Sequence, residues 1–594
     1  MNHLVDVLKE RCRTDADNAA FLVKRDDRWE PTTWADVDAE SDRIAAALLA
    51  IGLEKADSVC ILSSTRLEWT LSDLGIIKAG GVSIGIYQTL SGEQAAYILA
   101  DSQAKFLFIE DPGQAEKILP HLPELPHLQK IILFDGRPQN GRMVAMDAFL
   151  QQGADKLASA PDCVNEVISS IAPEDLALII YTSGTTGPPK GAMLTHKNFL
   201  AELAATDAID QEHVGDLMMF FLPLSHVGER IAQFMRIRRG ITGAYVKDIT
   251  KILDDIREIR PTFFGSVPRI FEKAYSRIRA EVDASPAWKQ RLFAWAEQTG
   301  RAASRHIQEG SVLPPGLKVR YRIADKLVLS KIRDLFGGRV RYFLSSAAPI
   351  STEILEFFHA CGMTILEGYG QTEISCFCTL CTPDAYRFGS VGKALPGVAL
   401  KTDEDGEILV KGDIVFPGYH NQTELNAKIL TADGWIRTGD LGRIDDNGYL
   451  WITGRKKDII ITSGGKNVTP SNIEHLIMGH PLIEHAMVHG DRRKYLTALI
   501  SLSPENLKEW GKASGYTDSD HEALTRLPEV TAEVQRAVDE ANAHLAKFET
   551  VKKFVILPKP FDIETGELTP TMKVRRRQVE DKYIDLLDAL YAEN

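Results

Sequence analysis

Residues 176–191 read LALIIYTSGTTGPPKG. A run of five apolar residues leads into a loop of serine, threonine and glycine that ends in Pro189 and Lys190. A short apolar run bounded by such residues is typical of a buried strand of an α/β protein. Small residues let backbone N–H groups approach an anion, hydroxyls add donors, and lysine adds positive charge. The stretch therefore predicts a strand followed by an anion-binding loop, with phosphate as the first candidate.

The loop does not fit the P-loop pattern G-x-x-x-x-G-K-[ST], because Pro189 precedes Lys190 and Gly191 stands at the hydroxyl position. An ordinary turn between two elements of an α/β fold is the alternative interpretation. The rest of the chain has to decide between them.

Composition limits the class of protein. The 594 residues are 44% hydrophobic and 25% charged, which is typical of a globular protein of several domains. A net charge of −13 argues against general nucleic-acid binding. No apolar run reaches the roughly 18 residues of a membrane span, and the first residues are too polar for a signal peptide. We expect a cytoplasmic protein that can contact a membrane peripherally.

The seven cysteines are scattered, which favours reduced thiols over a disulfide framework. Three of them, Cys376, Cys378 and Cys381, invite a zinc or iron–sulfur hypothesis. No fourth cysteine or nearby histidine completes a tetrahedral set, so we interpret the segment as core packing in a buried strand.

The first third of the chain alternates between helix and strand patterns. Thr33 is a suitable N-cap for a helix that ends before Gly52. The following segments are predicted as strand 59–62, helix 67–78, strand 81–86, helix 93–100 and strand 105–110. This βαβ rhythm predicts a parallel sheet covered by helices on both faces.

The pattern changes after residue 400, where 406–412 and 448–454 read as antiparallel strands separated by turns. A compact α+β unit follows, with predicted helices at 471–478 and 529–546, strands at 484–489, 496–502 and 553–557, and a final helix. We therefore expect an α/β fold. It consists of a large N-terminal domain (1–454) of helix-covered parallel sheets with a small β-barrel-like part, and a small, mobile α+β C-terminal domain (455–594).

Four further segments carry more polar chemistry than ordinary turns. They are FLPLSH (221–226), LEGYGQTE (366–373), GWIRTGD (434–440) and GRKKDIIITSGGKNVTP (454–470). Tyr369 could stack on a planar base, Thr372 could donate to phosphate, and Glu373 could hold Mg²⁺. Asp440 could accept both hydroxyls of a ribose. Taken singly, each segment has a structural alternative: a satisfied histidine, a solvated acid or a solvated basic loop.

Together these segments resemble the acyl-adenylate-forming enzymes, a superfamily of acyl-CoA synthetases, luciferases and peptide-synthetase adenylation domains. The resemblance covers nearly the whole chain in the family's motif order, and ELTPTMKVRRR (567–577) is similar to its C-terminal lysine motif. Within the superfamily, FLPLSHVGER and the two C-terminal motifs look most like long-chain fatty acyl-CoA synthetases, including the bubblegum group.

The resemblance implies a role for each matching residue. Lys573 would bridge the carboxylate and the phosphate, His226 would lie at the acyl entrance, Thr372 would contact the α-phosphate, and Glu373 would bind Mg²⁺, with Thr185 as a second metal candidate. Cofactor binding is implied for Thr182, Ser183, Gly184, Thr185, Thr186 and Lys190 (pyrophosphate), Ser346, Ala347, Ala348, Gly368, Tyr369 and Gly370 (adenine), Asp440 and Arg455 (ribose), Lys457 (hinge), and Gly464 and Gly465 (coenzyme A side).

The implied activity is ATP-dependent ligation of a fatty acid, most like a long-chain one, to coenzyme A through acyl-AMP, with Mg²⁺ as cofactor. Alternatives are an acyl-AMP ligase that loads a carrier protein, a coenzyme A ligase for a non-fatty carboxylate, and a degenerate adenylate-binding protein. Two departures matter. Ser346-Ala347 stands where the family often has glycines, and 235–245 contains three arginines. If that helix lines the acyl tunnel, the arginines must face solvent or a polar group of the substrate.

Overall fold

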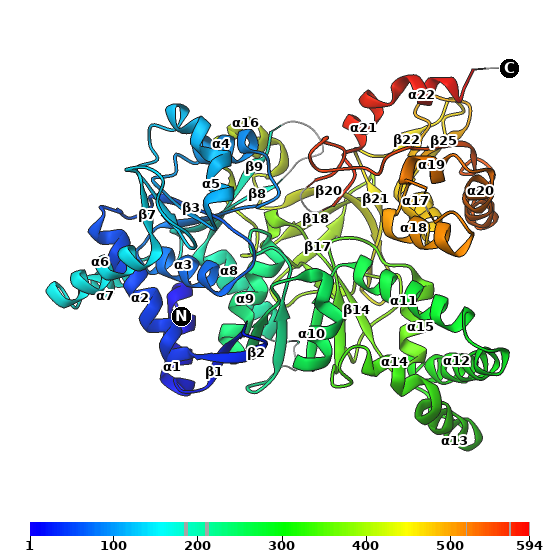
Figure 1. Ribbon diagram of the computed structural model, residues 1–594, viewed down its shortest axis with the longest axis horizontal. Coiled ribbons are helices and arrows are strands. Elements are labelled where there is room, and N and C mark those ends of the chain that lie inside the picture. Colours follow the sequence, from blue (N-terminus) through cyan, green and yellow to red (C-terminus); the bar gives the residue numbers. More distant parts are fainter. Residues whose placement is uncertain (183–187, 208, 210–212, 518, 570–571, 593–594) are drawn as a thin grey trace.

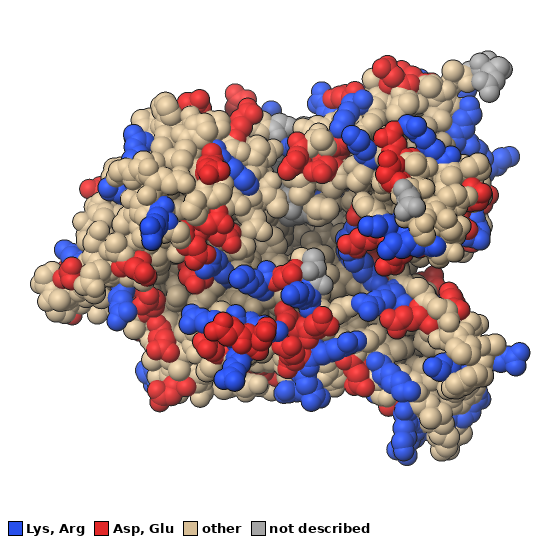
Figure 2. Space-filling view, viewed as in Figure 1, with Lys and Arg blue, Asp and Glu red and all other residues tan. Residues whose placement is uncertain are grey.

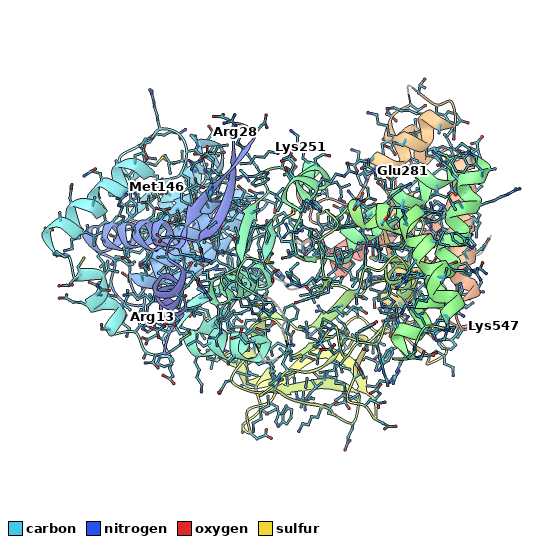
Figure 3. The ribbon with its side chains drawn as sticks, turned by 90° about the horizontal axis from the view of Figure 1, so that it is seen from below. Arg13, Arg28, Met146, Lys251, Glu281 and Lys547 are labelled. Carbon is cyan, nitrogen blue, oxygen red and sulfur yellow. The ribbon has the colours of Figure 1, made fainter. Side chains whose placement is uncertain are left out.

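The computed structural model describes residues 1–594 except 183–187, 208, 210–212, 518, 570–571 and 593–594. Figure 1 shows a large N-terminal part, coloured blue to yellow, and a smaller C-terminal part in orange and red at the upper right. Seen from below, Arg13 and Met146 lie toward one end of the large part, and Glu281 lies toward the other (Figure 3).

The largest sheet has eight strands in the order β19-β9-β8-β4-β3-β5-β6-β7. Its parallel strands are β3 (Ser58–Leu62), β4 (Val82–Ile86), β5 (Phe106–Ile109), β6 (Lys130–Leu133), β7 (Met143–Ala145) and β8 (Leu176–Thr182), and its antiparallel edge is β9 (Lys190–Thr195) and β19 (Gly418–Tyr419). Residues 176–182 and 190–191 of the opening segment thus lie on neighbouring antiparallel strands, and the predicted parallel sheet is confirmed.

Helices cover both faces of this sheet, as predicted. On β5, Phe106 and Phe108 join one core, while Leu107 and Ile109 join the core on the opposite face. The covering helices are α2 (Trp34–Ala50), α3 (Leu67–Lys78) and α6 (Met146–Ser159) on one face, and α4 (Gly92–Asp101) and α5 (Pro112–Ile118) on the other. The Thr33 hydroxyl accepts from the Asp36 N–H at 3.1 Å, so the predicted N-cap is confirmed.

A second sheet follows the order β12-β13-β14-β15-β16. Its strands are β12 (Phe263–Ser266), β13 (Tyr342–Ser345), β14 (Ile365–Tyr369), β15 (Thr379–Leu380) and β16 (Lys393–Ala394). The order β10-β11-β1-β2 describes a smaller sheet of β1 (Ala19–Arg25), β2 (Arg28–Thr33), β10 (Leu217–Phe220) and β11 (Thr242–Tyr245). Phenylalanine rings from α11 (Pro268–Asp283), α12 (Ala287–Gln308) and α15 (Thr352–Ala360) pack in the core beside the second sheet.

The predicted antiparallel region is a four-stranded sheet in the order β17-β18-β20-β21. Its strands are β17 (Ala399–Thr402), β18 (Glu407–Lys411), β20 (Ile436–Ile444) and β21 (Leu450–Arg455). Because β20 and β21 are antiparallel neighbours, Asp440 pairs with Arg455 across them. The order of the chain therefore places two predicted site residues side by side.

The C-terminal part has its own sheet, β24-β25-β26, and its own cores. It comprises β22 (Ile460–Ile461), β23 (Asn467–Val468), α17 (Pro470–Met478), β24 (Ile483–His489), β25 (Leu496–Leu502), α18 (Pro504–Ala513), α19 (His521–Thr525), α20 (Pro528–Ala543), β26 (Val551–Ile556), α21 (Arg576–Lys582) and α22 (Ile584–Ala589).

Two predicted helix boundaries in this part are wrong. The helix predicted over 529–546 ends at Ala543. The side-chain amide of Asn542 forms hydrogen bonds with the backbone N–H and C=O of Val551, and these bonds hold the chain where it turns back. The single final helix is two helices, because Tyr583 leaves the helical conformation with φ −112° and ψ 21°.

The arginines of 235–245 also differ from the expectation. Arg236 faces neither solvent nor a substrate group: it is fully buried and donates to the carbonyls of Ala20 and Ile241 at 2.8 and 3.2 Å. Its guanidinium lies 3.9 Å from the centroid of the Phe21 ring. Carbonyl dipoles and ring faces thus replace a carboxylate as its partners, while Arg238 and Arg239 pair with Asp207.

A buried ion pair fixes helix α9 (Val227–Arg239) against α3. The side chains of Asp73 and Arg230 are both 0% exposed, and two hydrogen bonds of 2.6 and 3.0 Å join them. Gln233 adds a third bond to Asp73 at 2.8 Å, and the guanidinium lies over the Trp69 ring. Burial lowers the pKa of Arg230 while Asp73 opposes that shift, so each charge depends on the other.

We predict that Asp73→Ala lowers the free energy of unfolding by about 3–5 kcal/mol, because it leaves the Arg230 guanidinium buried without a counter-charge. Glu40→Ala is the matched control, since it removes a helical pair with Arg43 that is partly exposed and worth at most about 1 kcal/mol. Denaturant unfolding of both variants gives the comparison. Equal losses would mean that the buried pair does not anchor α9.

Candidate active site

Three predicted site residues meet where β14, β20 and β21 converge. The Tyr369 hydroxyl donates to Asp440 Oδ2 at 2.8 Å, and Arg455 Nε lies 2.9 Å from Asp440 Oδ1. The Asp440 side chain is 6% exposed, whereas that of Arg455 is 54% exposed. Burial and the Asp440 charge raise the pKa of Tyr369, so the phenol stays protonated and remains a donor. The three residues form one polar cluster with a cation at its mouth.

Lys573 reaches this cluster from the C-terminal part of the chain. Burial lowers its pKa to about 8, and repulsion from Arg455 adds to the effect, while Asp440 and Glu373 oppose it. Two cations therefore lie close together beside two carboxylates. Such an arrangement favours the entry of an additional anion, because an anion relieves the repulsion between Lys573 and Arg455.

His226 lies within electrostatic range of Lys573, at the N-cap of α9. Its Nδ1 accepts from the Gly228 N–H at 3.0 Å, so Nε2 carries the proton. Burial and the nearby Lys573 lower the pKa of His226 to about 4. The imidazole is consequently neutral at neutral pH and can donate from Nε2 without adding charge.

Glu373 is held by a residue that the sequence analysis missed. The Tyr419 hydroxyl donates to Glu373 Oε1 in a short hydrogen bond, and Lys190 Nζ lies 5.7 Å from the centroid of the Tyr419 ring. Burial and repulsion from Lys457 lower the pKa of Lys190, while Glu373 opposes them. Tyr419 comes to this place because β19 pairs with β9, a contact between distant segments that no local pattern predicts.

The predicted adenine segments lie at the ends of β13 and β14. Ser346 N–H donates to the Ser266 carbonyl at 3.3 Å, and Ala347 and Ala348 are exposed. Ala347 has a φ of 71°, a left-handed conformation that favours glycine. The departure from glycine noted in the sequence therefore falls at a strained position.

Gly368 and Gly370 flank Tyr369 for a packing reason. A Cβ on Gly368 would come within 2.5 Å of the Leu380 side chain, and one on Gly370 would lie 1.6 Å from the Cys376 carbonyl oxygen. The three cysteines considered as metal ligands, Cys376, Cys378 and Cys381, are all buried beside this segment, and burial raises their thiol pKa values. The SCFC segment thus packs against the backbone that carries Tyr369.

Not every predicted residue joins the site. Ser183, Gly184, Thr185 and Thr186 lie outside the described residues, so the phosphate loop and the Thr185 metal ligand stay predictions. Their flanking residues Thr182 and Lys190 pair across β8 and β9. Thr372 is buried next to Glu373, and Lys457 is an exposed turn residue after β21. Gly464 and Gly465 lie in the exposed turn between β22 and β23.

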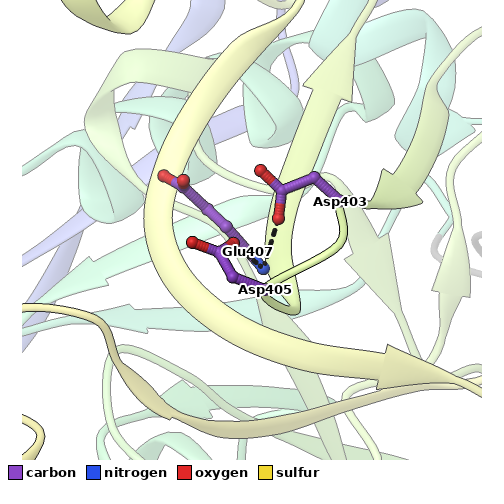
Figure 4. A group of neighbouring side chains, drawn as sticks. All are labelled: Asp403, Asp405 and Glu407. Atoms are coloured by element: carbon purple, nitrogen blue, oxygen red, sulfur yellow. Dashed lines mark hydrogen bonds between the residues drawn. The ribbon is translucent and has the colours of Figure 1, made fainter.

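An acidic cluster that the sequence analysis did not single out lies at the turn between β17 and β18 (Figure 4). Its members are Asp403, Asp405 and Glu407, and the first and last accept from Arg437 at 2.8 and 2.9 Å. Lys456 Nζ lies 3.0 Å from Glu407 and forms a shorter pair with Asp405. These ion pairs offset the negative charge of the three acids. They also connect Lys456, the residue before the predicted hinge, to the antiparallel sheet.

The family of the chain follows from comparison with known proteins. A model described as AMP-binding enzyme matches residues 8–420, and one described as AMP-binding enzyme C-terminal domain matches residues 457–594. The chain therefore belongs to the AMP-binding enzymes, which confirms the resemblance stated from the motifs.

Individual relatives are similar over nearly their whole length. The chain is 37% identical to the long-chain-fatty-acid–CoA ligase FadD15 of Mycobacterium bovis, over 98% of this chain and 96% of the relative. It is 33% identical to the human long-chain-fatty-acid–CoA ligase ACSBG1, over 97% and 83% of the two chains.

Solved structures agree with the fold. The adenylation domain of a carboxylate reductase from Mycobacterium chelonae superposes with a TM-score of 0.74 at 25% identity, over 100% of this chain and 91% of that one. The structure of ATP-bound MatB from Rhodopseudomonas palustris superposes with a TM-score of 0.68 at 25% identity, over 99% of this chain and 100% of that one. Within the described part of the chain, no helix is long and apolar enough to cross a membrane.

We predict that Gly370→Ala destabilises the protein by about 2 kcal/mol or more, because the added methyl overlaps a backbone carbonyl that cannot turn away like a side chain. Gly464→Ala is the matched control, since a Cβ there meets only Thr462 Oγ1 at 3.9 Å. Thermal unfolding measures both. Equal unfolding temperatures for the two variants would show that the backbone at Cys376 shifts to accommodate the methyl group without a loss of stability.

Proposed function

We propose that this protein ligates a long-chain fatty acid to coenzyme A at the expense of ATP. The carboxylate would attack the α-phosphorus and expel pyrophosphate, and the coenzyme A thiol would then displace AMP from the acyl-AMP. The observation that carries the proposal is the position of Lys573 within electrostatic range of Asp440, Arg455, Glu373 and His226. The names of the relatives, which are long-chain-fatty-acid–CoA ligases, support the substrate class.

The first step brings two anions together, so the site must supply positive charge where negative charge develops. Lys573 would lie between the carboxylate and the α-phosphate. Lys190 would hold the departing pyrophosphate together with the loop that follows Thr182. The depressed pKa values of both lysines fit this role, because bound phosphates would stabilise their charged forms.

The nucleoside would be held by the cluster around Asp440. Its carboxylate would accept from the ribose hydroxyls, Arg455 would keep that carboxylate ionised and oriented, and the Tyr369 ring would stack near the adenine. Neutral His226 would donate from Nε2 to the fatty acid carboxylate. Because His226 adds no charge, it would orient the nucleophile without weakening it.

Mg²⁺ would be held by Glu373, with Thr185 as the second candidate ligand, while Thr372 would contact the α-phosphate. A carboxylate beside hydroxyl groups fits a hard cation, and Tyr419 orients one oxygen of Glu373 by its hydrogen bond. When bound, the ion supplies charge neutralisation on the phosphates.

The second step would need a different arrangement, in which Lys573 withdraws from the acyl-AMP so that the coenzyme A thiol can reach it. We propose that residues 1–454 and 455–594 act as two domains and that the smaller one turns about Lys457. The pairing of Lys456 with Glu407 supports this pivot, since it fixes the chain immediately before it. The exposed Gly464–Gly465 turn would then face the thiol of coenzyme A.

We also propose peripheral contact with a membrane, where long-chain acids accumulate. Each methylene contributes about 0.8 kcal/mol to partitioning out of water, so little of a long-chain acid is free in solution.

Adenylation should slow above a pH of about 8. Only the protonated Lys573 can stabilise developing charge, and its pKa is lowered to about 8, so the active form is lost as the pH rises through that value. The measurement is kcat/KM for pyrophosphate release, which reports on the free enzyme. Lys573→Arg is the control: its guanidinium stays protonated, so the variant should be slower but without the alkaline decline. If Lys573→Arg still lost activity above a pH of about 8, the alkaline decline would belong to another titrating group.

The two half-reactions should separate in two variants. Lys573→Ala should slow pyrophosphate release by ~10²–10³-fold, typical for losing one transition-state donor, and barely affect thioester formation from ready-made acyl-AMP. Lys457→Pro should do the converse, because a fixed φ restricts the pivot. Loss of the coenzyme A thiol measures the second step.

Equal damage to both steps by Lys573→Ala would refute domain alternation. In the unmodified protein, pyrophosphate release without loss of the coenzyme A thiol would favour a carrier protein as acceptor. Pyrophosphate release with non-fatty acids alone would overturn the substrate class.

A further inference from the structure

Helices α12 and α13 (Pro315–Ala324) form a hairpin that projects from the large part at the lower right of Figure 1. A π-helical turn (Asp325–Leu329) and α14 (Ser330–Asp334) continue α13 without a break. The hairpin is firmly attached: Ser304 bonds the buried His359 at 2.6 Å, and Arg333 donates to the Cys361 carbonyl at 2.8 Å. It is a rigid projection from the body of the protein.

An apolar stripe runs along the outer face of this projection. Val319, Ile323 and Leu327 are 56, 48 and 45% exposed, and their spacing of four residues puts them on one helical face. The π-helical turn has more residues per turn than an α-helix, so it brings Leu327 back in line with the other two. Val312, at the tip of the hairpin, is 91% exposed. Single exposed apolar residues are common, but an aligned row needs an explanation.

Basic side chains flank the stripe. Between Pro315 and Arg333 the chain has six lysines and arginines and one acid, Asp325, which pairs with Arg333 at 2.6 Å. The other five basic residues are exposed, and none has an ion-pair partner among the described residues; they are Lys318, Arg320, Arg322, Lys326 and Lys331. Figure 2 shows blue side chains around this projection. The local charge contrasts with the −13 of the whole chain.

We propose that the helical segment 315–331 docks on the surface of an anionic lipid bilayer. Exposed apolar side chains with lysine and arginine on their flanks are the pattern of a helix that lies in the membrane interface. The cations would meet anionic headgroups while the stripe enters the acyl boundary. The inference rests on the proposed function, since a long-chain acid substrate gives the protein a reason to be at a membrane.

The charge pattern favours a membrane over another protein as the docking partner of segment 315–331. Exposed cations spread along almost four helical turns fit a surface of many mobile negative charges better than a few fixed carboxylates. The stripe is a row of convex side chains rather than a groove, so it offers a partner protein no cavity to fill. The projection also lies apart from the cluster around Asp440, so docking there leaves that cluster free.

The test is co-sedimentation of the full chain with vesicles of phosphatidylcholine, with and without phosphatidylglycerol. The wild-type chain should bind the anionic vesicles. Lys318→Glu/Arg320→Glu/Arg322→Glu should bind ~10²-fold less tightly, since each basic side chain contributes about fivefold. Val319→Ser/Ile323→Ser/Leu327→Ser should also bind at least ~10-fold less tightly, because it removes the inserted groups.

The matched control is Arg28→Glu/Arg137→Glu/Lys428→Glu, which changes the net charge equally at exposed cations outside the hairpin and should bind nearly as well as the wild type. The proposal would be overturned if the wild-type chain did not bind anionic vesicles. It would also be overturned if the hairpin variants lost no more affinity for the vesicles than the control variant. A wild-type dimer in sedimentation velocity that only the hairpin variants dissociate would overturn it too, because it would make the surface a contact between copies. Coenzyme A ligation of a long-chain acid supplied in neutral detergent micelles should be the same in all variants. Its absence in the wild type would defeat the proposed function, whereas the vesicle result would still report on membrane docking.

Discussion

The close approach of Lys573 and Arg455 beside Asp440 and Glu373 is the constraint on which the rest of the site depends. Desolvation by the surrounding protein lowers the pKa of Lys573, and repulsion from Arg455 lowers it further. Two carboxylates on separate elements, Asp440 and Glu373, offset this repulsion. A bound phosphate would remove the repulsion, so anion binding and closure of the C-terminal part favour each other.

The large part supplies a rigid frame for that closure. Asp440 and Arg455 face each other because β20 and β21 are antiparallel neighbours, and Tyr369 reaches them from the end of β14. His226 owes its position to α9, which the buried pair of Asp73 and Arg230 fastens to the first sheet's helical layer. The compensated acidic cluster fixes Lys456, so any swing of the C-terminal part has to begin after it.

The arginine-rich end of α9 shows how a polar sequence can belong to a core. Arg236 is buried among aromatic rings and carbonyl oxygens, and Arg230 has a carboxylate partner at the same depth. Neither arginine presents its charge to a substrate, so their presence does not argue against an apolar acid. Arginines on the projecting α13 have the opposite role, because they remain exposed beside an apolar stripe.

Local patterns were sufficient for much of this protein. Alternating apolar runs and caps predicted α2, α3 and the strands β3 to β5, because the hydrophobic period and the Thr33 cap act within one element. The motif loops were also recognisable, since small residues, hydroxyls and a lysine must follow strands to hold a phosphate. Local patterns and motifs thus predicted the α/β class, the order of the elements and the family, while the roles of the site residues stay predictions.

Tertiary structure alone decided which distant residues meet. Tyr419 reaches Glu373 only through the pairing of β19 with β9. The end of α20 depends on hydrogen bonds between the Asn542 side chain and the backbone of Val551. The burial of Arg236 depends on rings from three separate elements, and the lowered pKa of Lys573 depends on how the C-terminal part lies on the large one. The physical reason is common to all four: electrostatic and packing energies depend on distance in space, and residues far apart in the chain leave no local pattern that reports it.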